Sequence, residues 1–310
     1  MKKIALVALA LMAIGFFLML IGFMIGITPL YVDSTGMHRR MLQPELEEFT
    51  TTYDKSATVR LAFASEDVSI VRSDRFGYTV TGTYTQKLIG ELSPSHLTLT
   101  QENEHSWFDF GWDGLVMFGR GSWRGAQITI YIPEDMTVEF LDANIASGDI
   151  RIDAITVGSL ALNGASGDIT MTNVKANDTE INVMSGNIRL NSIEVDSMRF
   201  SGASGDVTAT DMVVNRSLTS QLMSGNIRIS GDLRGEIAFS GASGDLLIEI
   251  DGASENYDWT INGISSDVRV FDSRGELPSS TRRNGQTLSS LANTITIDAV
   301  SGNITLQFLR

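Results

Sequence analysis

The residues with the clearest chemical potential are aspartates that recur within one short phrase, Ser-Gly-Asp or Ser-Gly-Asn. Stacked carboxylates can act as acid and base on glycosidic bonds, or can hold Ca²⁺, which takes roughly six to eight oxygen ligands. Each copy supplies at most one carboxylate, however, and an active site is a local exception to a repeat. The sequence therefore predicts a structural corner ladder, with no catalytic residue, no metal site and no cofactor. The ladder residues are Gly148, Asp149, Gly167, Asp168, Gly186, Asn187, Gly205, Asp206, Gly225, Asn226, Gly244, Asp245, Asp267, Gly302 and Asn303.

Other chemistry-bearing residues form no recognised motif. The three histidines, His38, His96 and His105, precede the repeats and lack the spacing of metal ligands. No nucleophile elbow, phosphate-binding loop or dinucleotide fingerprint is found. The absence of cysteine excludes disulfides, thiol catalysis and thiolate metal sites. A net charge of −14 argues against nucleic-acid binding, which needs basic patches. The sequence thus predicts a protein that is not an enzyme and does not bind nucleic acid.

The spacing of the phrase predicts the elements that carry it. Its serines, from Ser147 to Ser301, lie 19, 19, 19, 20, 19, 22 and 36 residues apart. Such a period is typical of a solenoid, in which each unit buries its apolar face against its neighbours. Apolar and polar residues alternate on both sides of the phrase, as in Ile150-Arg151-Ile152 and Leu160-Ala161-Leu162, which indicates half-buried strands. We expect an all-β, single-stranded parallel β-helix of about 19 residues per coil, right-handed by the general preference of crossover connections.

A second alternation is superimposed on the first. Two residues before the serine stands a glycine in four Asp units, Gly164, Gly202, Gly241 and Gly263, and a larger residue in the Asn units, Val183, Leu222 and Ala299. Stacking at about 4.8 Å would interleave small and large side chains, and Asn would separate like-charged Asp residues. In chain order the corner column ends Asp245, Asp267, Asn303. A rival arrangement, with a repeat of 38 to 39 residues and Asp and Asn corners on opposite edges, remains open.

One stretch before the repeats is unusually aromatic. Residues 105–125 combine glycines with six aromatic residues that form a candidate contact loop: Trp107, Phe108, Phe110, Trp112, Phe118 and Trp123. An exposed aromatic loop could bind a glycan, a lipid or a partner protein. A hydrophobic cap over the open end of the solenoid is the alternative that we favour, because the terminal coils of every solenoid must be covered.

These motifs carry a resemblance to a known family. The run from Ile128 to Val138, ITIYIPEDMTV, followed by serial SGD-[IV] corners, resembles the DUF4097 family of adhesin-like bacterial proteins over roughly residues 55–310. The resemblance implies a β-helix with no established reaction, so no catalytic residue is carried over. Ser265-Ser266-Asp267, which lacks the glycine, and the insertion after it depart from the pattern.

The N-terminal residues predict a membrane anchor. Residues 4–27 carry no charge and follow Lys2 and Lys3. At about 1.5 Å per residue they would cross a hydrocarbon core of about 30 Å, with the N-terminus in the cytoplasm. A cleaved signal peptide is the alternative, although no clear cleavage site ends the run. We therefore expect an anchor over 1–27, a stalk over 28–54 and a solenoid over 55–310. Within the solenoid, N-terminal coils and the aromatic loop occupy 55–140, and regular coils occupy 141–310.

Two function classes follow. The first is a membrane-anchored, extracytoplasmic module of the cell envelope that binds envelope glycan or protein, as an adhesin does. The second is an accessory or sensor protein in an envelope-stress response, acting through a partner membrane protein. A hydrolase or lyase of envelope glycan is a distant third. The sequence names no ligand and does not predict the oligomeric state.

Overall fold

The computed structural model describes residues 30–33, 36–39, 46–82, 88–101, 126–277, 282–283 and 293–310. The chain forms two units. One includes an antiparallel hairpin of β1 (Leu30–Asp33) and β2 (Gly36–Arg39), and the other is a β-solenoid that contains all the remaining strands. Among the described residues, no helix is long and apolar enough to span a bilayer. The predicted anchor over residues 4–27 lies outside them.

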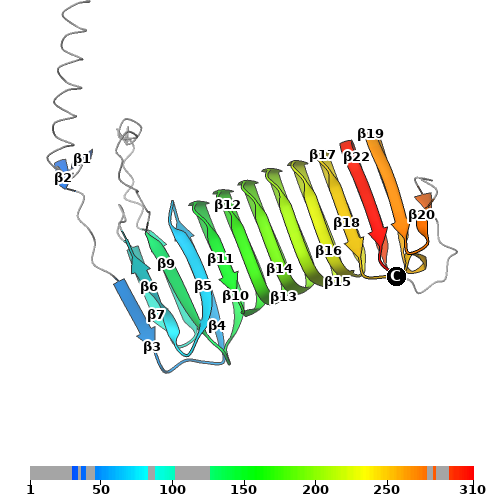
Figure 1. Cartoon of the computed structure of the whole chain (residues 1–310). Helices are drawn as coiled ribbons and strands as arrows, with labels where there is room; N and C mark the ends of the chain where they lie inside the picture. The colour runs from blue at the N-terminus through cyan, green and yellow to red at the C-terminus, as the bar shows by residue number, and fades with distance from the viewer. Residues whose placement is uncertain are drawn as a thin grey trace, which may run out of the picture. The chain divides into compact units, whose positions relative to one another are not determined.

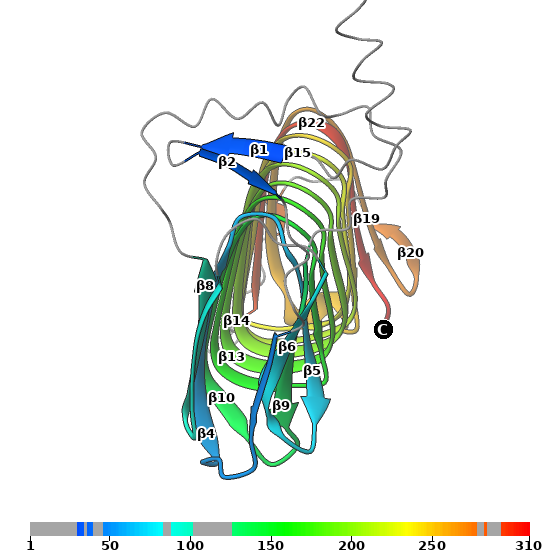
Figure 2. The ribbon, with the colours of Figure 1, turned by 90° about the vertical axis from the view of Figure 1, so that its left-hand side faces the viewer.

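The regular coils stack side by side in parallel (Figures 1 and 2). Each residue pairs with its equivalent in the next coil, 19 residues later: Ile169 pairs with Ile188, and Ser185 pairs with Ser204. This register confirms the 19-residue coil and excludes the arrangement with 38 to 39 residues per rung. The strands are β10 (Thr137–Ser147), β11 (Ile150–Asp153), β12 (Thr156–Ser166), β13 (Ile169–Ser185), β14 (Ile188–Ser204), β15 (Val207–Ser224), β16 (Ile227–Leu233), β17 (Glu236–Ser243) and β18 (Leu246–Ile250).

The interior follows the alternation of the sequence. Ile150, Ile152, Leu160 and Leu162 are all buried, whereas Arg151 between the first two is exposed. Alternate residues of a strand point to opposite faces, so each coil places one set inside the solenoid and one set in solvent. The core is therefore a stack of columns, each formed by equivalent residues of successive coils.

The C-terminal coils are not in chain order. β22 (Thr294–Phe308) lies between β17 and β18 on one side and β19 (Asp258–Asp272) on the other. The expected corner order Asp245, Asp267, Asn303 is therefore wrong, because Asn303 occupies the middle rung. Two short strands from the insertion, β20 (Gly275–Leu277) and β21 (Arg282–Arg283), pair antiparallel with β19. A short 3₁₀ helix, η2 (Ser254–Asn256), precedes β19.

The N-terminal coils show the same departure. The first coil in sequence, β4 (Ser56–Phe63) and β5 (Asp67–Ser73), lies between β10 and β11 on one side and β8 (His96–Gln101) and β9 (Gln127–Pro133) on the other. Ser65-Glu66-Asp67, which joins β4 to β5, thus forms a corner of the same stack, and Asp67 Oδ1 accepts the N–H of Asp149 at 2.9 Å.

Antiparallel strands complete this end. β6 (Phe76–Thr81) pairs with β9 and with β3 (Leu46–Thr50), and β7 (Leu88–Ser93) pairs with β8. β3 falls within residues 28–54, which the sequence assigned to a stalk, and yet it belongs to the sheet.

Aromatic side chains pack at both ends of the stack. Tyr257 and Trp259 lie with their ring centroids 5.3 and 5.4 Å from that of Phe308, and the Tyr257 hydroxyl donates to the Leu233 carbonyl at 2.9 Å. At the other end, the guanidinium of Arg75 lies 3.7 Å from the ring centroid of Phe49. These contacts bury apolar surface where a terminal coil has a neighbour on one side only.

Candidate functional site

The corner glycines are required by backbone geometry. Gly205 has φ = +127°, and a Cβ placed on it would lie 2.0 Å from the carbonyl oxygen of Gly186 in the preceding coil. Both the positive φ and the close approach exclude other residue types. Gly205 therefore turns the chain at a point where the backbones of two coils are in contact.

Asp and Asn recur at the next position because their side chains link successive coils. The Oδ1 of Asp149 accepts the backbone N–H of Asp168 at 3.0 Å, and the Oδ1 of Asp168 accepts that of Asn187 at 2.9 Å. The same bond continues along the column: Asn187 Oδ1 accepts the N–H of Asp206 at 3.1 Å, and Asp206 Oδ1 accepts the N–H of Asn226 at 2.8 Å. Both side chains carry the required acceptor oxygen, so either can occupy a rung. The carboxylates considered for catalysis thus serve as backbone acceptors.

Spatial order restores the alternation that chain order breaks. The corner column reads Asp206, Asn226, Asp245, Asn303 and Asp267. The Nδ2 of Asn226 lies 3.3 Å from the Oδ1 of Asp206, and the Nδ2 of Asn303 lies 3.0 Å from that of Asp245. Each of these Asn residues separates two carboxylates and donates to one of them, which reduces like-charge repulsion. Alternation holds in the column from Asp168 onward, and its continuation would place Asn303 between the two aspartates, although the adjacent Asp149 and Asp168 show that it is not a general rule.

Where two carboxylates are neighbours in the column, arginine side chains rather than asparagines lie against them. Asp149 and Asp168 are adjacent rungs, and Arg189 Nη1 lies 2.6 Å from Asp168 Oδ2. This hydrogen bond is the main cause of a lowered pKa at Asp168, and the backbone N–H of Asn187 adds to it. Arg151 Nη2 lies 3.5 Å from Asp149 Oδ2.

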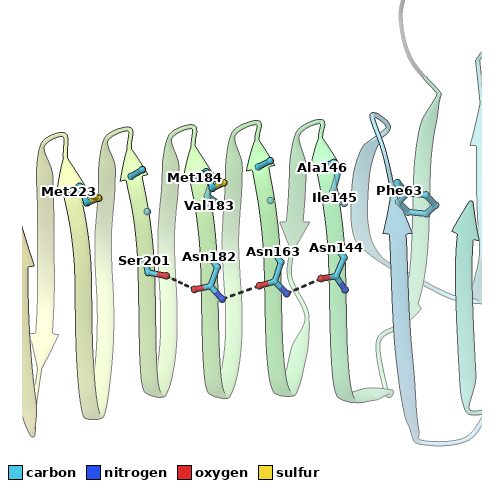
Figure 3. A pocket seen from close by; sticks show the side chains of 14 residues that line it. Phe63, Asn144, Ile145, Ala146, Asn163, Asn182, Val183, Met184, Ser201 and Met223 are labelled. Atoms are coloured by element: carbon cyan, nitrogen blue, oxygen red, sulfur yellow. Dashed lines mark hydrogen bonds between the residues drawn. The ribbon is translucent and has the colours of Figure 1, made fainter. Parts of the chain in front are cut away.

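A shallow hollow of about 580 Å³ lies on the outer face of the strands that precede the corners (Figure 3). An amide ladder runs along its side: Asn163 Nδ2 donates to Asn144 Oδ1 at 3.0 Å, and Asn182 Nδ2 donates to Asn163 Oδ1 at 3.0 Å. The Ser201 hydroxyl continues the ladder by donating to Asn182. Among the residues that the structure describes, none that lines the hollow is charged.

Apolar side chains beside the ladder remain in solvent. They occupy the position just before each corner serine and form one straight column, which we call the exposed apolar row: Ala146, Ala165, Met184, Ala203, Met223, Ala242 and Val300. Met184 and Met223 are 66% and 65% exposed, and Val300 is 49% exposed. A single exposed apolar residue is ordinary, whereas a contiguous exposed apolar set is a candidate contact surface. This row was not predicted from the sequence, although the residue just before the serine alternates between Ala and Met from Ala165 to Ala242.

The remaining candidate residues are the aromatic loop, the histidines and possible metal ligands. The aromatic contact loop, Trp107 to Trp123, lies outside the described residues, as does His105. His96 Nε2 lies 2.7 Å from the Oγ1 of Thr98. Within the described part of the chain, no three His, Cys, Asp or Glu residues are grouped as a metal site would require. Glu66 occupies the glycine position of its corner and is 2% exposed; its carboxylate accepts the Ser65 N–H at 2.8 Å and a hydrogen bond from Gln101.

Comparison with known proteins identifies the family. The model of the Toastrack family, DUF4097, matches residues 57–307, so the chain belongs to this family. No curated protein matches the sequence.

Two solved structures are similar. One, named a "putative adhesin", is from Bacteroides fragilis; the match has a TM-score of 0.45 and 11% identity and covers 86% of this chain and 98% of that one. The other, a "putative cell adhesion protein" from Clostridium sporogenes, gives 0.27 and 8% over 86% of this chain and 99% of that one.

Proposed function

We propose that this protein is a non-enzymatic, membrane-anchored Toastrack module that works by binding, as an adhesin does, in the cell envelope. The observation that carries the proposal is the exposed apolar row with the uncharged hollow beside it. Both lie on a sheet whose successive strands are linked by hydrogen bonds, so the surface is presented on a rigid support. Membership of the Toastrack family supports the proposal at the level of fold.

The binding part of the proposal is tested in cells. Proteins cross-linked to the wild-type chain are captured and compared with those captured by a Met184→Glu/Met223→Glu variant and by a 105–125 deletion. The matched control is Thr208→Glu, which adds charge at an exposed position outside the row, between the register partners Arg189 and Arg228. We expect the row variant, but not the control, to lose partners. Identical capture by all four chains would overturn the proposed binding surface, whereas loss with the deletion alone would assign binding to the aromatic segment.

The anchoring part rests on the uncharged residues 4–27 after Lys2 and Lys3. They would hold the N-terminus in the cytoplasm and the solenoid outside. Protease added to intact cells should then digest the solenoid while cytoplasmic proteins remain whole. Complete protection would reverse the topology, and a released form that starts near residue 28 would replace the anchor by a cleaved signal peptide.

A further inference from the structure

The exposed apolar row has a regular relief. Along the stack its residues read Ala165, Met184, Ala203, Met223, Ala242 and Val300, so a large side chain stands on every second rung. Rungs are about 4.8 Å apart, which gives a period of about 9.6 Å. The relief is a line of knobs separated by holes of similar width. Interior packing does not account for it, because these side chains point into solvent.

Uncharged side chains border the row along most of its length. On one side run the corner serines, and on the other run Asn144, Asn163, Asn182, Ser201, Gln221 and Ser240, followed at the last rung by the exposed carboxylate of Asp298. The chain as a whole has a net charge of −14. Two copies of such an acidic chain repel each other least where neutral faces meet. The neutral band is therefore a surface on which two copies can approach.

We propose that the exposed apolar row pairs with the same row of a second copy, in an antiparallel two-fold arrangement. This inference rests on the proposed binding function of the row and names its partner. A two-fold axis between the rungs of Ala203 and Met223 sets each large side chain against a small one. Met223 then faces Ala203, Met184 faces Ala242, and Val300 faces Ala165 of the other copy. Such an interface is isologous, since each contact occurs twice.

The period of the row favours a second copy over other occupants. A second row has the same spacing of about 4.8 Å, so knobs and holes stay in phase over about 24 Å, the length of the five steps from Ala165 to Val300. Beside the row, Ser201 then faces Gln221 of the other copy, Asn182 faces Ser240 and Asn163 faces Asp298, and an amide can donate to each of these oxygen-bearing side chains. The acidic corner ladders of the two copies lie along the same edge, so their repulsion opposes pairing. We expect a weak dimer, in the class of interfaces smaller than about 1,200 Å².

Cysteine cross-linking tests the arrangement directly, because the chain has no cysteine of its own. The full-length chain, solubilised in detergent, carries Met184→Cys and Ala242→Cys together. Within one chain these positions are three rungs, about 14 Å, apart, beyond the Cα separation of about 7 Å that a disulfide allows. In the proposed dimer they face each other. We expect covalent dimers on mild oxidation of the double variant and none with either single variant, whose cysteines remain about three rungs apart across the interface.

A second measurement does not depend on cysteine variants. Sedimentation of the wild-type chain should show a monomer–dimer equilibrium that shifts toward dimer between about 0.1 and 1 M salt, where the Debye length falls from about 10 to 3 Å. Met223→Glu should weaken association about tenfold or more, because it buries unpaired charge, whereas Thr208→Glu should leave it unchanged.

The outcomes separate the two proposals. Dimers that form equally with single and double variants, or a wild-type chain that stays monomeric at all concentrations, would overturn the paired arrangement. If the chain stays monomeric and the row variant still loses partners in cells, the row binds a foreign partner, and only the inference of a second copy fails. If the row variant neither dissociates dimers nor loses partners, both proposals fail.

Discussion

The middle and the ends of the solenoid follow different rules. From β10 to β18 the spatial order of the coils is the order of the chain, and each coil packs against its predecessor and its successor. At the N-terminal end the outermost parallel coil is β8–β9, which follows β4–β5 in sequence. At the C-terminal end it is β19, which precedes β22 in sequence. The first coil, β4–β5, and the last strand, β22, are each enclosed between two neighbours.

This difference shows how a repeat protein covers the free faces of its terminal coils. A coil in the middle has two faces covered by identical neighbours, so its sequence can repeat. A terminal coil has one free face and exposed strand edges, which must be covered by something else. Here antiparallel strands and aromatic residues cover those faces, and the segments that begin and end the stack are held from both sides.

The largest effect is expected from removal of β22. Without residues 294–310, β19 loses its parallel partner and β17–β18 lose their outer neighbour, so amide protection over 258–277 should fall to the level of an open chain. The matched deletion takes two whole coils from the middle, residues 167–204, and joins Ser166 to Gly205, which keeps the alternation of corner residues. Hydrogen exchange should show the remaining coils protected. Continued protection of β19 after loss of β22 would show that it moves into the vacated register, contrary to the expectation.

A corner glycine in the middle should be far less replaceable than a glycine of similar conformation at the end. Gly205 and Gly275 have φ of +127° and +128°, but a Cβ on Gly205 would meet a carbonyl oxygen at 2.0 Å and one on Gly275 meets nothing within 4 Å. Gly205→Ala should lower the free energy of unfolding by about 3 kcal/mol, against about 1 kcal/mol or less for Gly275→Ala. Chemical denaturation measures both. Equal losses would mean that backbone strain alone, without close packing of coils, sets the requirement.

Asn226→Asp in the middle and Asn303→Asp at the end should have equal effects. Each replaced Asn lies between two aspartates and donates to one of them, Asp206 or Asp245. The change should cost about 1 kcal/mol in each case and should be partly relieved by salt, since the carboxylates are near the surface. Melting at low and high salt provides the measurement. A smaller effect at Asn303 would indicate that it has one acidic neighbour, as chain order implies.

A stabilising substitution is expected inside the middle coils. Ser220 is 1% exposed, packs between Phe200 and Phe239 in its column, and its hydroxyl has no hydrogen-bond partner among the described residues. Ser220→Ala should raise the free energy of unfolding by about 1 kcal/mol, because it removes an unsatisfied buried hydroxyl. Ser220→Leu, at the same site, should overpack against the two rings and destabilise. If Ser220→Ala is destabilising in thermal melts, the hydroxyl has a partner such as a water molecule.

The smallest effect concerns acid. The pKa of Asp168 is lowered by the hydrogen bond from Arg189, so its ionised form stabilises the folded state. This contribution is complete above the ordinary pKa of 3.8 and is lost as the pH falls below it through the folded-state value. Asp168→Asn should therefore flatten the loss of stability on acidification below about pH 4. An equally steep acid profile in the variant would show that Arg189 confers no measurable stability in solution.

The repeating coil follows from the sequence alone. Gly205 and its equivalents must adopt a positive φ against the carbonyl of the coil below, and alternation such as Ile150-Arg151-Ile152 must place one face inside, so period and register follow from local chemistry. The sequence also identified the corner ladder residues, because only side chains with an oxygen at that position can accept the N–H of the next corner.

The order of the coils at the two ends, and which side chains lie together on the outer faces, depend on the tertiary structure. Asp267 and Asn303 fit either of two adjacent rungs by local rules, and the choice depends on which strand covers β19 and how the insertion returns the chain. Likewise Met184 and Met223, 39 residues apart in sequence, become one row because intervening coils stack in phase. Such contacts depend on elements distant in sequence, so the alternation of residue types along the repeats is compatible with them but does not determine which coils are neighbours.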